Sequence, residues 1–233
     1  PITLCVKKNA SRILYFRSNL LAFATKNYFV ISLIIHMSSL VNLLANFDNQ
    51  TLLFFNSWID NLPAFGFLFK LLAVGLIYLF PVILTIGYFW SRDAKKVMVM
   101  SAVSGVFCWQ AVGKIVSIFY YRSRPSASEL IDLKEIFFHR PDYSFPSDHA
   151  MFIAAVATMF WFYGYKKLSH WTWGIGILIV VMRVVVAVHY PLDIVAGLII
   201  GALVSFVLYK NRYFMEKYIS LPIEKIIFRV LKR

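Results

Sequence analysis

Long apolar runs separated by short polar segments are the main pattern along this chain. Several runs approach the roughly 20 residues that a helix needs to cross the hydrocarbon core of a bilayer. The fold class expected is therefore all-α, a polytopic helical membrane bundle with about six spanning helices in a single domain over residues 1–233. The predicted spans are Tyr28–Phe47, Leu71–Trp90, Val97–Tyr121, Ala150–Tyr165, Trp171–Val188 and Pro191–Tyr209.

Departures from a plain apolar run give three further expectations. Segment Phe47–Phe65 mixes aromatic residues with acidic and amide residues, which favours an interfacial helix over another span. Pro81 is expected to kink the second span, because proline has no N–H for the helical hydrogen bond. Gly197 and Gly201 are four residues apart in the last span, a spacing typical of helices that pack closely in membranes.

The distribution of charge predicts the orientation of the bundle. The chain is 60% hydrophobic and 15% charged, with a formal net charge of +13. Its basic residues gather between the spans, so positive-inside topology explains the charge better than binding to nucleic acid. In the six-span arrangement 17 Lys and Arg residues fall on one side and five on the other, which predicts that both termini are cytoplasmic. The basic tails are residues 1–26 and 210–233, and the second is either an amphipathic helix on the inner leaflet or a solvated tail.

Two arginines near the predicted outer face are candidates for binding an anion. Arg183 lies inside an apolar run, where a guanidinium costs roughly 2.5–3.5 kcal/mol. Arg124 follows the third span. Forked guanidinium donors suit phosphate oxygens and stabilise the extra charge of a five-coordinate transition state. The alternative for Arg183 is an ion pair within the membrane, for example with Asp193.

Two histidines accompany these arginines. Ser147 and His149 stand at the start of the fourth span, where backbone N–H groups bind anions and His149 could donate a proton. An ordinary helix cap is the alternative. His189 and Asp193 are four residues apart, so on a helix Asp193 could orient the imidazole and leave its other nitrogen free to attack. A structural histidine at the membrane interface is the alternative.

Together these motifs resemble the signature of the type-2 phosphatidic acid phosphatase superfamily, K-x6-R-P, then P-S-G-H, then S-R-x5-H-x3-D. The matching segments lie in the right order within residues 114–193. The resemblance implies a membrane phosphatase in which His189 attacks phosphorus, His149 protonates the leaving group and Asp193 orients His189. It implies no metal and no cofactor. The residues implied to bind the phosphate are Arg124, Arg183, Ser147, Asp148 and either Lys114 or Arg122.

Three positions depart from the family signature. Ser117 stands where the signature has lysine, so Lys114 one turn earlier, or Arg122, is expected to replace it. Met182 replaces the serine before Arg183, and Asp148 replaces the glycine of the second motif. The P-S-D-H sequence and the adjacent interfacial helix resemble the branch that contains bacterial undecaprenyl pyrophosphate phosphatases.

The resemblance also implies the partners and the location. These are a phosphorylated lipid and the bilayer, with no nucleic acid, and an active site on the outer side of a bacterial cytoplasmic membrane. Undecaprenyl pyrophosphate is the favoured substrate, and phosphatidylglycerophosphate, phosphatidic acid and lipid A remain open. A lipid phosphotransferase and a non-enzymatic lipid transporter are the alternatives from other classes. The loop Ser126–Tyr143 is expected to be a solvated connector, with a lid over the headgroup as the alternative.

Overall fold

The computed structural model describes residues 32–33, 35–127, 133 and 143–231, and the chain divides into two compact units, residues 1–47 and 48–233. In the first unit residues 35–47 are helical, and most of their apolar side chains are exposed. The predicted span Tyr28–Phe47 begins outside the described residues, so it stays a prediction. The predicted basic tail 1–26 and most of the loop Ser126–Tyr143 also lie outside them.

The second unit is a bundle of apolar helices. Within the described residues four helices are long and apolar enough to cross a membrane: Pro63–Trp90, Arg92–Phe119, Lys166–Val185 and Pro191–Lys210. A fifth, α6 (Asp148–Phe162), is apolar but shorter. These five helices correspond to the last five predicted spans, and the prediction of an all-α polytopic membrane protein is confirmed.

Irregular turns interrupt the first two of these helices. The helix around Pro81 is made of η1 (Pro63–Phe65), α2 (Gly66–Lys70), the π-helical turn η2 (Leu71–Gly75), η3 (Leu76–Tyr78) and α3 (Leu79–Trp90). Proline cannot donate to the carbonyl four residues earlier, and the change of helix type lies just before it. The next helix is made of α4 (Arg92–Phe107), the π-helical turn η4 (Cys108–Val112) and α5 (Gly113–Phe119).

Helix α6 is the centre of the second unit. Nine of its fifteen side chains are buried, and it contacts α4, α7 (Lys166–Val185) and α8 (Pro191–Lys210). The contact with α8 is very close: a Cβ added at Gly201 would lie 2.3 Å from the Met151 carbonyl oxygen, and one added at Gly197 would lie 2.8 Å from that of Ser147. The close helix packing predicted from the glycine spacing is therefore confirmed.

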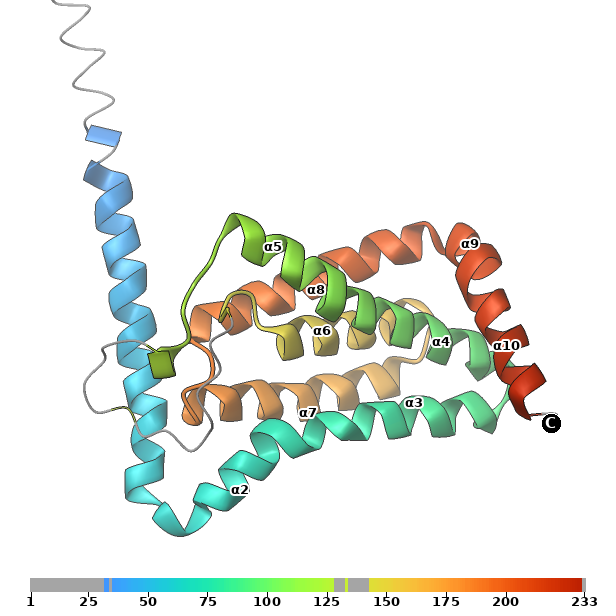
Figure 1. Ribbon diagram of the computed structural model, residues 1–233, viewed down its shortest axis with the longest axis horizontal. Coiled ribbons are helices and arrows are strands. Elements are labelled where there is room, and N and C mark those ends of the chain that lie inside the picture. Colours follow the sequence, from blue (N-terminus) through green and yellow to red (C-terminus); the bar gives the residue numbers. More distant parts are fainter. Residues whose placement is uncertain (1–31, 34, 128–132, 134–142, 232–233) are drawn as a thin grey trace, which may run out of the picture. The chain divides into compact units, whose positions relative to one another are not determined.

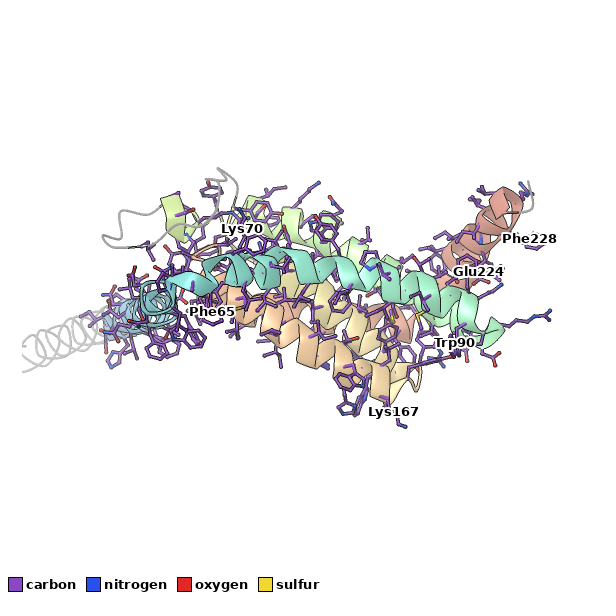
Figure 2. All side chains as sticks on the ribbon, turned by 90° about the horizontal axis from the view of Figure 1, so that it is seen from below. Phe65, Lys70, Trp90, Lys167, Glu224 and Phe228 are labelled. Atoms are coloured by element: carbon purple, nitrogen blue, oxygen red, sulfur yellow. The ribbon has the colours of Figure 1, made fainter. Side chains whose placement is uncertain are left out.

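The long helices of the second unit run lengthwise beside one another, with α9 (Arg212–Met215), η6 (Glu216–Ser220) and α10 (Leu221–Leu231) crossing one end (Figure 1). Figure 2 shows Trp90 and Lys167 at this end with Glu224 and Phe228, and Lys70 at the other end. The turns predicted to be cytoplasmic thus share one end of the bundle. The N-terminus of α6, the C-terminus of α7 and the N-terminus of α8 share the other (Figure 1).

Helical residues 48–61 pack at this second end through a polar and an apolar contact. The Asn56 amide donates to the carbonyl of Val185 at 2.9 Å. Phe55, Trp58 and Ile59 pack on an apolar cluster formed by Phe69, Ala73, Met182, Val185 and Val186. The segment predicted as an interfacial helix is thus helical, and it is fixed to the end of α7.

The α6–α8 contact gives a first testable prediction. Gly201→Ala is expected to destabilise the protein by about 1–3 kcal/mol, because a methyl group there overlaps backbone atoms of α6 that cannot move separately. Gly174→Ala on α7 is the matched control, since a Cβ there meets nothing within 4 Å and gains the same helix propensity. Thermal unfolding in detergent should show a lower Tm for the first variant only. An equal Tm for both would contradict the close contact.

Candidate active site

Arg183 joins the two histidines at the polar end of the bundle. It lies in the last turn of α7 and is only 5% exposed. Its Nη2 lies 3.3 Å from Nε2 of His189, and its Nη1 lies 3.3 Å from Nε2 of His149. Nη1 also donates to the carbonyl of Ala73 at 3.2 Å, in the π-helical turn η2. The irregular turn and the active-site arginine are therefore in direct contact.

The hydrogen bonds of His189 define its protonation state. Its Nδ1 lies 2.9 Å from the Ser144 carbonyl oxygen, which can only accept, so Nδ1 carries the hydrogen and Nε2 has the lone pair. Nε2 faces Nη1 of Arg124 at 3.4 Å and Nη2 of Arg183 at 3.3 Å. Burial lowers the pKa of His189 to about 4, and the two guanidinium groups add to this effect. The imidazole is therefore neutral near pH 7, with the lone pair of Nε2 facing two cations.

Asp193 acts on His189 through Ser144 and not through the direct hydrogen bond expected from the sequence. Ala187 has a left-handed φ of 53°, so the chain between α7 and α8 is not helical. Asp193 Oδ2 consequently lies 3.9 Å from Nδ1 of His189. The Ser144 hydroxyl donates to Asp193 Oδ2, while its carbonyl accepts from His189. Ser144 thus fills the position that the helical spacing assigned to the carboxylate.

A cavity of about 300 Å³ opens beside these groups. Its polar lining residues are Arg124, Arg183, His149, Asp148 and Ser126. The other lining side chains come from several helices and are mostly apolar: Val74, Ile77, Tyr78, Pro81, Trp109, Phe152, Val186, Ala187 and Val188. The cavity therefore offers charged side chains to a phosphate and apolar side chains to the hydrocarbon chain of a lipid.

The structure brings Arg124 and Ser147 to this end of the bundle. Arg124 is 4% exposed, and its Nη1 donates to the Val188 carbonyl at 3.1 Å as well as facing His189. The sequence predicted that the Ser147 backbone binds an anion. Its N–H instead donates to the Asp193 carbonyl at 3.1 Å. The Ser147 hydroxyl, in contrast, is buried without a hydrogen-bond partner.

Two predicted phosphate ligands lie away from the cavity. Lys114 is exposed, and its Nζ donates to the Gln110 side chain at 3.0 Å. Arg122 donates to Asp193 Oδ1 at 2.9 Å and to Asp48 Oδ2 at 2.6 Å. Arg122 is therefore held between two carboxylates. Neither Lys114 nor Arg122 lines the cavity in place of the lysine of the signature.

Sequence reasoning missed two residues of this network, Asp48 and Ser144. Asp48 is fully buried, although its segment was expected to lie at the membrane interface. Ser144 acts through its carbonyl as well as its hydroxyl, and a backbone acceptor leaves no mark in the sequence. The only available signal was an isolated acidic residue at the start of an aromatic segment.

A comparison with known families places the chain in one of them. The sequence profile of the PAP2 superfamily matches residues 71–216, well over half of the chain. The chain belongs to the PAP2 superfamily. The resemblance inferred from the three motifs is confirmed, and so is the prediction that the chain is a phosphatase-type hydrolase.

Three bacterial relatives of this PAP2 protein are similar over much of its length. Undecaprenyl-diphosphatase BcrC of Bacillus subtilis is 24% identical over 76% of this chain and 89% of its own length. The putative undecaprenyl-diphosphatase YbjG of Escherichia coli is 26% identical over 68% and 79%. The bacitracin transport permease protein BcrC of Bacillus licheniformis is 30% identical over 50% of this chain and 57% of its own length.

A solved structure shares the PAP2 fold. LpxE of Aquifex aeolicus superimposes with a TM-score of 0.50 at 23% identity, covering 68% of this chain and 94% of that protein. At this identity the likeness concerns the fold alone. It agrees with a multi-pass membrane protein.

The different positions of Arg183 and Lys114 give a second prediction. Arg183→Lys keeps the charge but loses the fork that reaches both histidines, so kcat/KM for a lipid phosphate should fall roughly 10²- to 10³-fold. Lys114→Ala should change kcat/KM by less than about threefold, because an exposed charge outside the cavity is screened. Phosphate release in detergent micelles measures both. A large loss in Lys114→Ala with a small one in Arg183→Lys would contradict the geometry.

Proposed function

We propose that the protein removes the terminal phosphate from a lipid pyrophosphate through a phosphohistidine at His189, with undecaprenyl pyrophosphate as the favoured substrate. The observation that carries the proposal is the environment of His189. Its lone-pair nitrogen faces two buried arginines that also line a cavity whose other lining residues are mostly apolar. A nucleophile placed between cations suits attack on an anionic phosphorus centre.

The first chemical step transfers the terminal phosphoryl group to the enzyme. Nε2 of His189 forms a bond to phosphorus, and the bond from phosphorus to the bridging oxygen breaks. Arg124 and Arg183 turn their N–H donors from the imidazoles to the phosphate oxygens, where negative charge accumulates. His149 gives its proton to the bridging oxygen, which leaves as the lipid monophosphate.

The second step returns the enzyme to its starting state. His149, now neutral, takes a proton from a water molecule as that water attacks the phosphohistidine. The bond between phosphorus and Nε2 breaks, and inorganic phosphate leaves. Nδ1 of His189 keeps its hydrogen throughout, because the Ser144 carbonyl accepts it at 2.9 Å.

Two observations support a lipid pyrophosphate as the substrate. Most of the side chains that line the cavity are apolar, which suits the hydrocarbon chain of a lipid phosphate, an isoprenoid chain included. The relatives that align over two thirds of this chain carry undecaprenyl-diphosphatase names. The active site lies at the end opposite the basic turns, so the positive-inside rule favours an outward-facing site in a bacterial cytoplasmic membrane.

The covalent step gives a third prediction. With substrate carrying ³²P in its terminal phosphate, His149→Asn should form an acid-labile, alkali-stable phosphoryl-protein slowly, because it lacks the acid for the first step. It should then retain the label, because it also lacks the base for hydrolysis. His189→Ala should form none and should lose essentially all turnover. His170→Ala is a control, since His170 is exposed on α7 and outside the cavity. Full activity of His189→Ala would refute the mechanism.

The substrate assignment gives a fourth prediction. Phosphate release should be fastest, by kcat/KM, with undecaprenyl pyrophosphate in a panel that also holds phosphatidylglycerophosphate, phosphatidic acid and lipid A. If the rate of phosphate release stays the same after acceptor lipids are added, this result would argue against a phosphotransferase. A preference of tenfold or more, about 1.4 kcal/mol, for another lipid would overturn the substrate but leave the reaction type intact.

A further inference from the structure

Asp48 is a buried carboxylate to which the reaction above gives no task. It lies at the start of the helical segment 48–61, is 0% exposed and does not line the cavity. Its Oδ1 accepts from the backbone N–H of Leu192 at 2.9 Å, and its Oδ2 accepts from Arg122 at 2.6 Å. A buried carboxylate is costly unless it is paired, and here each oxygen has its own partner.

Arg122 passes this contact on to the active site. Its second terminal nitrogen donates to Asp193 Oδ1 at 2.9 Å, and its guanidinium lies 3.6 Å from the centre of the Tyr190 ring. The cation is thus fixed by two carboxylates and one aromatic face. None of Asp48, Arg122, Tyr190 and Asp193 lines the cavity.

Asp193 is held through both of its oxygens as a result. Oδ1 accepts from Arg122, while Oδ2 accepts from the Ser144 hydroxyl and from the N–H of Tyr190 at 2.9 Å. The orientation of the carboxylate fixes Ser144, whose carbonyl holds Nδ1 of His189. A continuous set of hydrogen bonds therefore leads from Asp48 to the nucleophile.

Asp48 also fixes the backbone that follows the nucleophile. Leu192 is the second residue of α8, and its N–H would have no partner within the helix. Asp48 supplies that partner from a segment 144 residues earlier in the sequence. Leu192, three residues after His189 in the first turn of α8, is thereby fixed against the segment 48–61.

We propose that Asp48 is a positioning residue for phosphoryl transfer, acting through Arg122 and the N-terminus of α8 to hold Asp193, Ser144 and His189 in their reactive arrangement. The proposal rests on His189 being the nucleophile. Phosphorylation of Nε2 places a positive charge on the imidazole ring, and Asp193 stabilises this charge from the Nδ1 side of the ring. Asp48 balances the charge of Arg122, so that Arg122 does not cancel the effect of Asp193.

The test compares Asp48→Asn with Asp48→Glu in the full chain, using undecaprenyl pyrophosphate labelled with ³²P. Asp48→Asn should slow single-turnover phosphorylation of His189 roughly 10- to 100-fold, the loss typical of residues that orient a reactive group through an intermediate residue. KM and inhibition by inorganic phosphate should change less than about threefold, because Arg124 and Arg183 are untouched. Asp48→Glu should recover part of the rate, because it restores the charge beside Arg122.

Asp60→Asn is the matched control, since Asp60 is exposed on the same helical segment and undergoes the same chemical change. It should leave the phosphorylation rate at the wild-type value. A wild-type rate in Asp48→Asn would overturn the proposal. So would equal losses of rate, phosphate affinity and Tm without recovery in Asp48→Glu, because they would indicate a purely structural role. Activity of His189→Ala in the same assay would instead refute the proposed function.

Discussion

The active site depends on burying Arg183 in an apolar bundle. A guanidinium that is only 5% exposed needs acceptors for its hydrogens, and the Ala73 carbonyl and Nε2 of His189 supply two of them. In the proposed mechanism the phosphate of the substrate adds charged acceptors at this point, so anion binding offsets part of the free energy that burial of the guanidinium costs.

The helix packing makes this burial possible. Arg183 comes from α7 and His149 from α6, and α6 is held against α8 by contacts that admit no side chain at Gly197 or Gly201. The approach of α8 brings the Asp193 carbonyl to the N–H of Ser147. Gly197 packs against Ser147, two residues before His149, so the contact that holds the two helices together also positions the start of α6.

The sequence predicted the parts of the structure that repeat or that carry rare residues. Apolar runs located the five helices of the bundle, and the glycine spacing located the contact between α6 and α8. Arg183, His149 and His189 were expected to converge from their order and topology, and they do. The role of Lys114 could not be foreseen, because it depends on which face of α5 it occupies where that helix ends at Phe119. The partners of Arg122 could not be predicted either. Asp48 is 74 residues away in the chain, and a periodic pattern in the sequence indicates only contacts between near neighbours.

The position of His189 between two sets of charges explains how it can be both neutral and reactive. Arg124 and Arg183 face Nε2, and together with burial they disfavour its protonation. On the other side Asp48, Arg122 and Asp193 carry a net negative charge, and Ser144 connects them to Nδ1. In the proposed attack the phosphoryl group brings negative charge to the two arginines, which stabilise it. The positive charge that develops on the ring is disfavoured by the same arginines, and the carboxylates on the Nδ1 side offset this effect.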